Sequence, residues 1–221
     1  MIHCKLSSLF LSTTFVLFAV LVTLCKGGSD VTDGFTAVPL NEGNFKLQKP
    51  NGVDPSGRYS FKSGVRKLWV YSNDKPFKPD TDTKPRTELR ITGYDYSSGV
   101  WQFEAYAYIP KGTTGVSIMQ IFNGDNRRPT LMLSVYDGRL KFKNKDVIED
   151  NINDKWFRIN VVHTFGESIY VYINGRKKYF LPDDQGGGDC YFKFGVYAQE
   201  GSSNYMESKW TDVKIYRKSL R

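Results

Sequence analysis

YFKFGVYAQ, residues 191–199, alternates between two chemically different sets of side chains. The first set is apolar and consists of Phe192, Phe194, Val196 and Ala198. The second set is polar or aromatic, has Gly195 in its middle, and consists of Tyr191, Lys193, Tyr197 and Gln199. Neighbouring side chains of an extended strand point to opposite faces of a sheet. The segment is therefore predicted to be a strand with one face in a hydrophobic core and the other in a binding wall.

Similar short segments, rich in Val, Ile, Tyr, Phe and Trp, recur through the chain, and no long segment has helical periodicity. Asp137-Gly138 separates segments 131–136 and 140–142, and Asn174-Gly175 separates 169–173 and 177–180. Both dipeptides favour tight hairpin turns. Further predicted strands are 67–72, 87–92, 100–108, 115–122, 156–163, 191–199 and 210–217. This pattern predicts an all-β sandwich or barrel.

The N-terminal residues predict a secretory signal peptide. Lys5 provides a basic start, residues 9–24 are almost wholly apolar or small, and small residues near 25–28 suit cleavage. The apolar run of about sixteen residues is shorter than the roughly 20 that a spanning helix needs. We therefore expect a signal peptide at 1–27, a single domain at 28–221, and delivery to the secretory pathway, with the vacuole or the cell exterior as destination.

The chain is basic, with 31 Lys and Arg against 23 Asp and Glu and a formal net charge of +8. The predicted signal peptide contributes Lys5 and Lys26 to that charge, and no acid. No Lys/Arg-rich run or nucleic-acid motif is present, which argues against a nucleic-acid partner. Anionic carbohydrate or small carboxylates fit the charge better, and a mildly basic solvated surface is the alternative.

Cysteine and histidine are scarce in residues 28–221, which follow the predicted signal peptide. This part of the sequence contains one cysteine, Cys190, and one histidine, His163. A disulfide framework is not expected, and a domain of roughly 190 residues can be stabilised by its own core. We interpret Cys190 as a structural thiol and His163 as a structural or surface histidine. The acidic residues show no calcium-loop spacing, so we expect no metal and no cofactor. The glycine-rich segment 182–189 is interpreted as a connection or lid.

RTELR, residues 86–90, alternates in the same way, with Arg86, Glu88 and Arg90 on one face. Burying such charges is costly unless they pair, so the row must face solvent or line a polar groove. Glu88 between two guanidinium groups can hold both in fixed orientations and leave a net positive surface for a carboxylate. The alternative is a solvated outer face with weak surface ion pairs.

Gln120 lies in the otherwise mostly apolar segment VSIMQIF, residues 116–122. A polar amide in such a strand needs hydrogen-bond partners, which the structure itself can provide. A functional alternative is that Gln120 binds the same anion as the arginines.

Three segments, RTELR (86–90), QIF (120–122) and YFKFGVYAQ (191–199), together resemble signature strands of the jelly-roll alginate lyase family, in the same order. The resemblance extends over nearly the whole predicted mature chain. The connecting segments, including GYDYSSGVWQFE, TLMLSVYDG, YINGR and YMESKW, are more similar to a plant, vacuolar branch of this family that binds citrate. The resemblance implies a concanavalin-like β-jelly-roll sandwich of two curved antiparallel sheets, with matched polar side chains in a concave groove.

The resemblance also implies roles for single residues. In the lyases of this family, elimination begins when a uronate carboxylate is neutralised, which acidifies the proton on the adjacent carbon. Arg86 and Gln120 match the residues with that task, and Tyr197 matches the tyrosine that protonates the leaving oxygen. Lys193 matches a groove cation, and Glu88 and Arg90 match the supporting charge row.

Phe122 is a departure from this pattern, because the lyase motif has histidine after Gln-Ile or Gln-Val. Phenylalanine can neither accept a proton nor assist a base. Elimination with Tyr197 as both base and acid would require a strongly lowered phenol pKa.

We therefore expect a non-catalytic protein that binds citrate or a similar polycarboxylate. The predicted ligand-binding residues are Arg86, Glu88, Arg90, Gln120, Lys193, Tyr197 and Gln199. The alternative is a polysaccharide lyase that cleaves a polyuronate such as glucuronan or alginate by β-elimination, with Tyr197, Gln120 and Arg86 as catalytic residues. A wall-polysaccharide binding module is a third possibility that would use the same groove.

Overall fold

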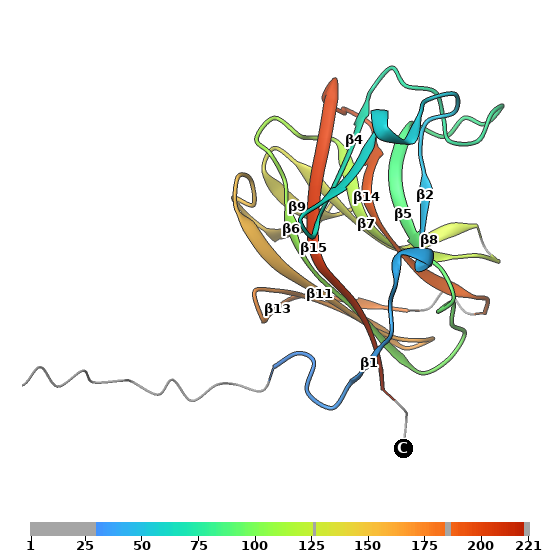
Figure 1. Cartoon of the computed structure of the whole chain (residues 1–221). Coiled ribbons are helices and arrows are strands. Elements are labelled where there is room, and N and C mark those ends of the chain that lie inside the picture. Colours follow the sequence, from blue (N-terminus) through green and yellow to red (C-terminus); the bar gives the residue numbers. More distant parts are fainter. Residues whose placement is uncertain (1–29, 126, 184–186, 219–221) are drawn as a thin grey trace, which may run out of the picture.

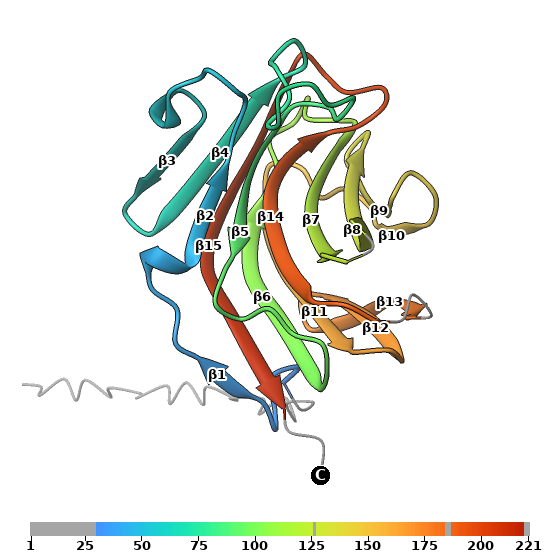
Figure 2. The ribbon, with the colours of Figure 1, turned by 90° about the vertical axis from the view of Figure 1, so that its right-hand side faces the viewer.

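The computed structural model describes residues 30–125, 127–183 and 187–218. Its strands form two antiparallel sheets packed face to face, which confirms the predicted all-β sandwich (Figures 1 and 2). Helical structure in these residues is limited to two short 3-10 turns, η1 (Glu42–Asn44) and η2 (Pro55–Gly57). Among the described residues, no helix has the length and hydrophobicity of a membrane-spanning segment. The predicted signal peptide, and residues 184–186 of the glycine-rich segment, lie outside the described residues.

Sheet A has eight strands, with β1 paired to β15 beside the main path. In spatial order they are β13 (Arg176–Pro182), β12 (Ser168–Ile173), β11 (Trp156–Thr164), β6 (Val100–Tyr108), β15 (Tyr205–Lys218), β4 (Val65–Tyr71), β3 (Tyr59–Lys62), and the added β1 (Thr36–Val38).

Sheet B has seven strands, and its centre joins segments that are far apart in the sequence. In spatial order they are β10 (Val147–Glu149), β9 (Arg139–Phe142), β8 (Arg128–Tyr136), β7 (Val116–Asn123), β14 (Cys190–Ala198), β5 (Arg86–Ile91) and β2 (Phe45–Gln48). Lys193 pairs with Gln120 on one side and with Arg90 on the other. The three motif strands are therefore direct neighbours, with β14 in the middle (Figure 2).

The hydrophobic core lies between the sheets and includes the apolar face predicted for residues 191–199. Phe192, Phe194 and Val196 are at most 2% exposed. The ring of Phe103 from sheet A lies 5.9 Å from that of Phe192 and 5.8 Å from that of Phe194. Burying one such side chain contributes roughly 1.5–3 kcal/mol, so this face of β14 anchors the strand to the opposite sheet.

Gly195 brings β14 and β5 close together at the point where Glu88 pairs with it. Its φ of +139° is a conformation that other residues rarely adopt, and a Cβ there would lie 2.3 Å from the backbone oxygen of Thr87. The pairing of β14 with β7 also shifts register between Phe194 and Tyr197. Glycine is therefore required at 195 to place Glu88 against the middle of β14.

The two predicted hairpins are confirmed, because Asp137-Gly138 joins β8 to β9 and Asn174-Gly175 joins β12 to β13. All four turn residues have positive φ. The longer predicted strands also match within a few residues. The short strands β1, β2, β3 and β10 were not predicted from the sequence.

His163 and Cys190 are both buried. The His163 ring contacts the Tyr96 hydroxyl through Nδ1 at 2.7 Å and the Asp183 carboxylate through Nε2 at 2.8 Å. Burial lowers the pKa of His163, and the hydrogen bond to Asp183 opposes that shift. Burial also raises the pKa of the Cys190 thiol to about 12, which keeps it protonated. Both side chains thus have structural positions away from solvent.

Candidate functional site

A pocket of about 580 Å³ lies on the outer face of sheet B. Four of the predicted site residues line it, namely Arg86, Gln120, Lys193 and Tyr197. They come from three adjacent strands, so the alternation of β5, β7 and β14 directs their side chains to one place. The pocket is thus centred on the three sequence motifs.

Glu88 lies beneath this pocket and is fully buried. Lys193 Nζ donates to its carboxylate at 2.7 Å, and Arg86 Nη1 lies 3.4 Å from the same oxygen. The amide nitrogen of Gln120 donates to the other carboxylate oxygen. A single buried carboxylate therefore orients three groups of the pocket wall.

Lys193 is only 2% exposed and lies at the floor of the pocket. Burial lowers the pKa of its ammonium group, Glu88 opposes this shift, and the charges of Arg86 and Arg90 add to it. An anion in the pocket would act in the same direction as Glu88 and would favour the charged lysine. Lys193 is consequently suited to bind an anionic ligand.

Arg86 stacks over the ring of Tyr197, with the guanidinium carbon 3.8 Å from the ring centroid. Its Nε is buried and has no hydrogen-bond partner among the described residues. Because a buried donor without a partner costs free energy, Arg86 gains when an acceptor enters the pocket. The stacking on Tyr197 fixes the plane in which this acceptor must lie.

Arg90 and Gln199 lie outside the pocket lining. The expectation that Glu88 orients both arginines is wrong for Arg90, which forms its ion pair with Asp95 and stacks over Tyr191 at 3.7 Å. The Gln199 amide donates to the backbone oxygens of Tyr197 at 3.1 Å and Ala198 at 2.9 Å. The nearby loop residue Asp95 thus provides Arg90 with a counter-charge that strand alternation does not reveal.

Phe122 forms an apolar wall of the pocket. Its ring lies 5.4 Å from that of Tyr191, and Lys193 Nζ lies 5.5 Å from its centroid. His163, the histidine that could compensate for the missing base, is fully buried on β11 in the other sheet. The described pocket lining therefore contains no histidine, and Phe122 itself cannot accept a proton.

Loop residues complete the pocket and were missed by the sequence analysis. Phe77 and Lys78 come from the segment between β4 and β5, and Arg127 comes from the turn between β7 and β8. The proline-rich composition of the first segment predicts a loop, but no periodic pattern shows which of its side chains reach a site. Only the fold brings these residues to the three motifs.

The described lining contains four cations and no carboxylate: Lys78, Arg86, Arg127 and Lys193. With Glu88 beneath them, this region has a formal net charge of +3. Another hollow, of about 440 Å³, is lined by one cation and one carboxylate, Lys111 and Asp137. The excess of positive charge thus distinguishes the pocket of sheet B.

Comparison with known proteins gives matches that cover most of the chain. A family model described as "Alginate lyase" matches residues 38–217. "Citrate-binding protein" of Hevea brasiliensis is 52% identical over 191 residues, which are 86% of this chain and 80% of that protein.

Solved structures are similar at lower identity. Alginate lyase PA1167 from Pseudomonas aeruginosa has a TM-score of 0.64 and 16% identity, covering 81% of this chain and 100% of that one. Alginate lyase AlgAT5 from polysaccharide lyase family 7 has a TM-score of 0.63 and 19% identity, covering 80% and 95%. At such identities these structures show the shared fold.

Proposed function

The chain belongs to the alginate lyase family, and from this premise we propose that it binds citrate or a similar small polycarboxylate without cleaving a substrate. The family assignment agrees with the resemblance found in the three sequence motifs. The name of the Hevea brasiliensis relative, which is 52% identical, supports the choice of citrate.

The observation that carries the proposal is the excess of cations over carboxylates in the pocket. Four cations line a single volume: Lys78, Arg86, Arg127 and Lys193. Among the described residues, Glu88 is the carboxylate that contacts this group from below. A ligand with several carboxylates balances such a charge better than a monocarboxylate does. A trianion matches the formal charge of +3.

Each pocket residue is assigned a different contact with the ligand. Arg86 offers its guanidinium group to one ligand carboxylate, which a planar fork binds well. Lys193 acts as a point charge at the floor, oriented by its 2.7 Å contact with Glu88. Gln120, whose amide nitrogen binds Glu88, presents its oxygen as an acceptor for a ligand hydroxyl. Phe122 keeps the adjoining wall dry, which strengthens these contacts.

One arrangement favours the alternative of a polyuronate lyase, because Arg86, Gln120 and Tyr197 line the same pocket. A lyase would neutralise the uronate carboxylate with Arg86 and Gln120 and would transfer protons through Tyr197. Phe122 opposes this function, since no base stands at its position. Incubation with glucuronan and alginate, monitored by the ultraviolet absorbance of an unsaturated product, should show no cleavage. Activity that disappears in Tyr197→Phe would favour the lyase.

Calorimetric titration tests the proposal directly. Citrate added to the folded protein should give a saturable heat with one ligand per chain. The titration is done at neutral and at acidic pH, because protonation lowers the charge of the ligand. Absence of a binding heat at both pH values would contradict citrate as the ligand.

A further inference from the structure

The outer face of sheet A carries a row of lysine and aromatic side chains that the pocket does not use. Lys67 on β4 pairs with Lys209 on β15, Lys209 with Tyr108 on β6, and Tyr108 with Trp156 on β11. Trp69 follows Lys67 on the same face of β4, two residues along. We call these five residues, Lys67, Trp69, Tyr108, Trp156 and Lys209, the lysine–aromatic band.

The two lysines of the band share one carboxylate. Lys67 Nζ lies 2.8 Å and Lys209 Nζ 3.5 Å from the carboxylate of Glu207. Like charges directly opposite each other on neighbouring strands are destabilising. Both lysine side chains are more than a third exposed, at 38% and 36%. The pair thus leaves one positive charge in excess, in a place that a second anion can reach from solvent.

Aromatic rings flank this charge on both sides. Lys67 Nζ lies 5.1 Å from the centroid of the Trp69 ring, and Lys209 Nζ lies 5.0 Å from that of Tyr108. The Tyr108 and Trp156 rings are 5.5 Å apart. Trp156 is 43% exposed, and Tyr106 on the same face is 40% exposed. An apolar ring surface beside a cation can bind a molecule that is apolar on its faces and charged at its edge.

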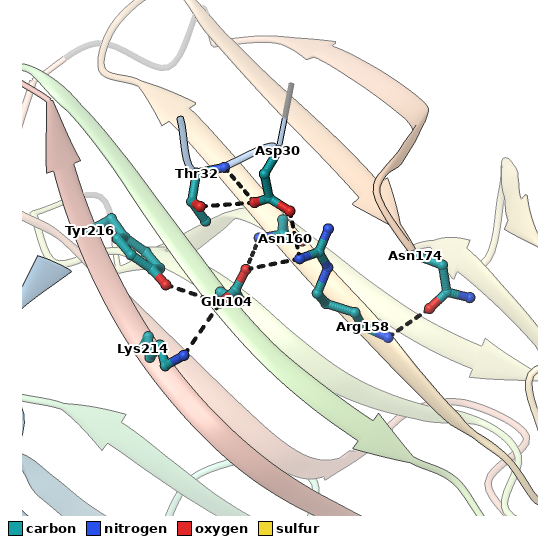
Figure 3. A network of polar contacts seen from close by, with 8 residues as sticks. All are labelled: Asp30, Thr32, Glu104, Arg158, Asn160, Asn174, Lys214 and Tyr216. Carbon is teal, nitrogen blue, oxygen red and sulfur yellow. Dashed lines mark hydrogen bonds and ion pairs between the residues drawn. The ribbon is translucent and has the colours of Figure 1, made fainter. Parts of the chain in front are cut away.

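A second group of charges on this face is already balanced and provides a contrast. In Figure 3, Arg158 reaches both Asp30 and Glu104, at 2.9 Å and 3.8 Å, and Lys214 approaches Glu104 at 4.0 Å. Two cations here meet two carboxylates. In the lysine–aromatic band, by contrast, two lysines contact one carboxylate, that of Glu207, and the carboxylate of Asp154 lies at the edge of the band, 3.3 Å from the Tyr108 hydroxyl.

We propose that the lysine–aromatic band is a second binding site, for an acidic polysaccharide chain. Sugar carboxylates bind Lys67 and Lys209, and the apolar faces of the pyranose rings stack on Trp156 and Tyr108. Strands lie about 4.8 Å apart, so the four strands from β4 to β11 span roughly 14 Å, room for a short run of linked sugars. The band and the pocket lie on different sheets, so polymer and small carboxylate bind independently.

Affinity electrophoresis in gels that contain polygalacturonate tests this site, with gels of neutral hydroxyethyl cellulose as reference. Polygalacturonate should retard the wild-type chain more strongly than the neutral polymer does. The double variant Lys67→Ala/Lys209→Ala, and separately Trp156→Ala, should weaken binding to polygalacturonate by roughly tenfold. Thermal unfolding measures whether each variant is folded. The double variant removes both lysines that pair with Glu207 and can therefore be less stable. Trp156→Ala leaves these ion pairs intact and tests the site independently.

Two control variants separate the band from other surfaces. Phe180→Ala removes an aromatic residue of β13 that is 49% exposed, and it should leave the retardation unchanged. Arg86→Ala and saturating citrate should also leave it unchanged, because both act in the pocket of sheet B. The proposal is overturned if polygalacturonate does not retard the protein, if the band variants bind normally, or if Arg86→Ala or citrate abolishes the retardation.

Discussion

Glu88 in sheet B and Glu104 in sheet A have similar surroundings. Each is at most 7% exposed and lies in the interior of its sheet. Each binds one side-chain amide, since Gln120 donates to Glu88 and Asn160 donates to Glu104 at 2.7 Å. Each also faces two cations, Lys193 and Arg86 in one case and the arginine and lysine drawn in Figure 3 in the other.

The two sites differ in what covers them. Asp30 accepts from Arg158 at 2.9 Å and adds a second carboxylate to the Glu104 site. The Glu88 site has no second carboxylate in the described pocket lining, and Lys78 and Arg127 add further positive charge. A buried ion pair is thus no sign of a binding site. The capacity to bind an anion comes from cations that the protein itself leaves without a counter-charge.

Replacing Arg86 has the largest expected effect, because it reduces the excess of cations over carboxylates in the pocket of sheet B. Arg86→Ala removes a cation that lines the pocket, whereas Arg90 lies outside the lining, and citrate affinity should fall by at least about 100-fold. Arg90→Ala is the matched control, since Asp95 already neutralises that arginine, and calorimetry should show a change below about threefold. Equal losses in both variants would contradict the assigned roles.

Removing the charge of each central glutamate is expected to affect stability unequally. Glu88→Gln leaves buried Lys193 without its carboxylate and should cost about 3–5 kcal/mol of unfolding free energy. Glu104→Gln should cost about 1 kcal/mol, because Arg158 keeps Asp30 and Lys214 is 53% exposed. Urea unfolding measures both values. Citrate should restore part of the loss in Glu88→Gln alone, and equal costs in the two variants would show that the sites are equivalent.

His163 belongs to a third buried cluster, with Tyr96 and Asp183, that can be compared with the clusters around Glu88 and Glu104. Burial holds the pKa of His163 in the folded protein below 6.5, the usual value of an exposed histidine. As the pH falls below 6.5, the unfolded state therefore binds more protons than the folded state does. Stability should therefore decrease on acidification, by at most about 1.4 kcal/mol per pH unit. His163→Gln removes this contribution, and its unfolding free energy should depend less on pH between about 7.5 and 5.5. An unchanged pH dependence in urea titrations would show that other groups cause it.

Asp30 provides the smallest expected effect. Thr32 and Arg158 lower the pKa of its carboxyl to about 2. Its contribution to stability is therefore present above the unfolded value of 3.8 and is lost as the pH falls through about 2. Asp30→Asn should cost less than about 1 kcal/mol at neutral pH, since this side chain is 42% exposed. Denaturation curves of wild type and variant should converge in acid, and citrate affinity should not change.

Regular alternation made much of the fold predictable from the sequence. The apolar face of β14 and the two glycine hairpins follow from side-chain period and turn chemistry, because these are local properties. Short strands such as β2 (Phe45–Gln48) and β10 (Val147–Glu149) were missed because three or four residues cannot show a period. These strands depend on pairing with a neighbour that is distant in the sequence.

The pocket was predictable only where its residues lie on strands. Arg86, Gln120, Lys193 and Tyr197 could be named in advance because alternation and motif resemblance place them on one face. Arg127 comes from a turn, where no period exists. The pairing of Arg90 with Asp95 could not be predicted either, because the direction of a loop side chain depends on the surrounding fold.

The most direct measurement compares citrate with its neutral triethyl ester, by calorimetry at low and high salt. If excess positive charge in the pocket of sheet B drives binding, citrate should bind with one site per chain and the ester should not bind. Citrate affinity should also fall as salt rises from about 0.02 M to about 0.5 M, because salt screens the attraction. Equal binding of ester and citrate, or citrate affinity that does not respond to salt, would contradict this account.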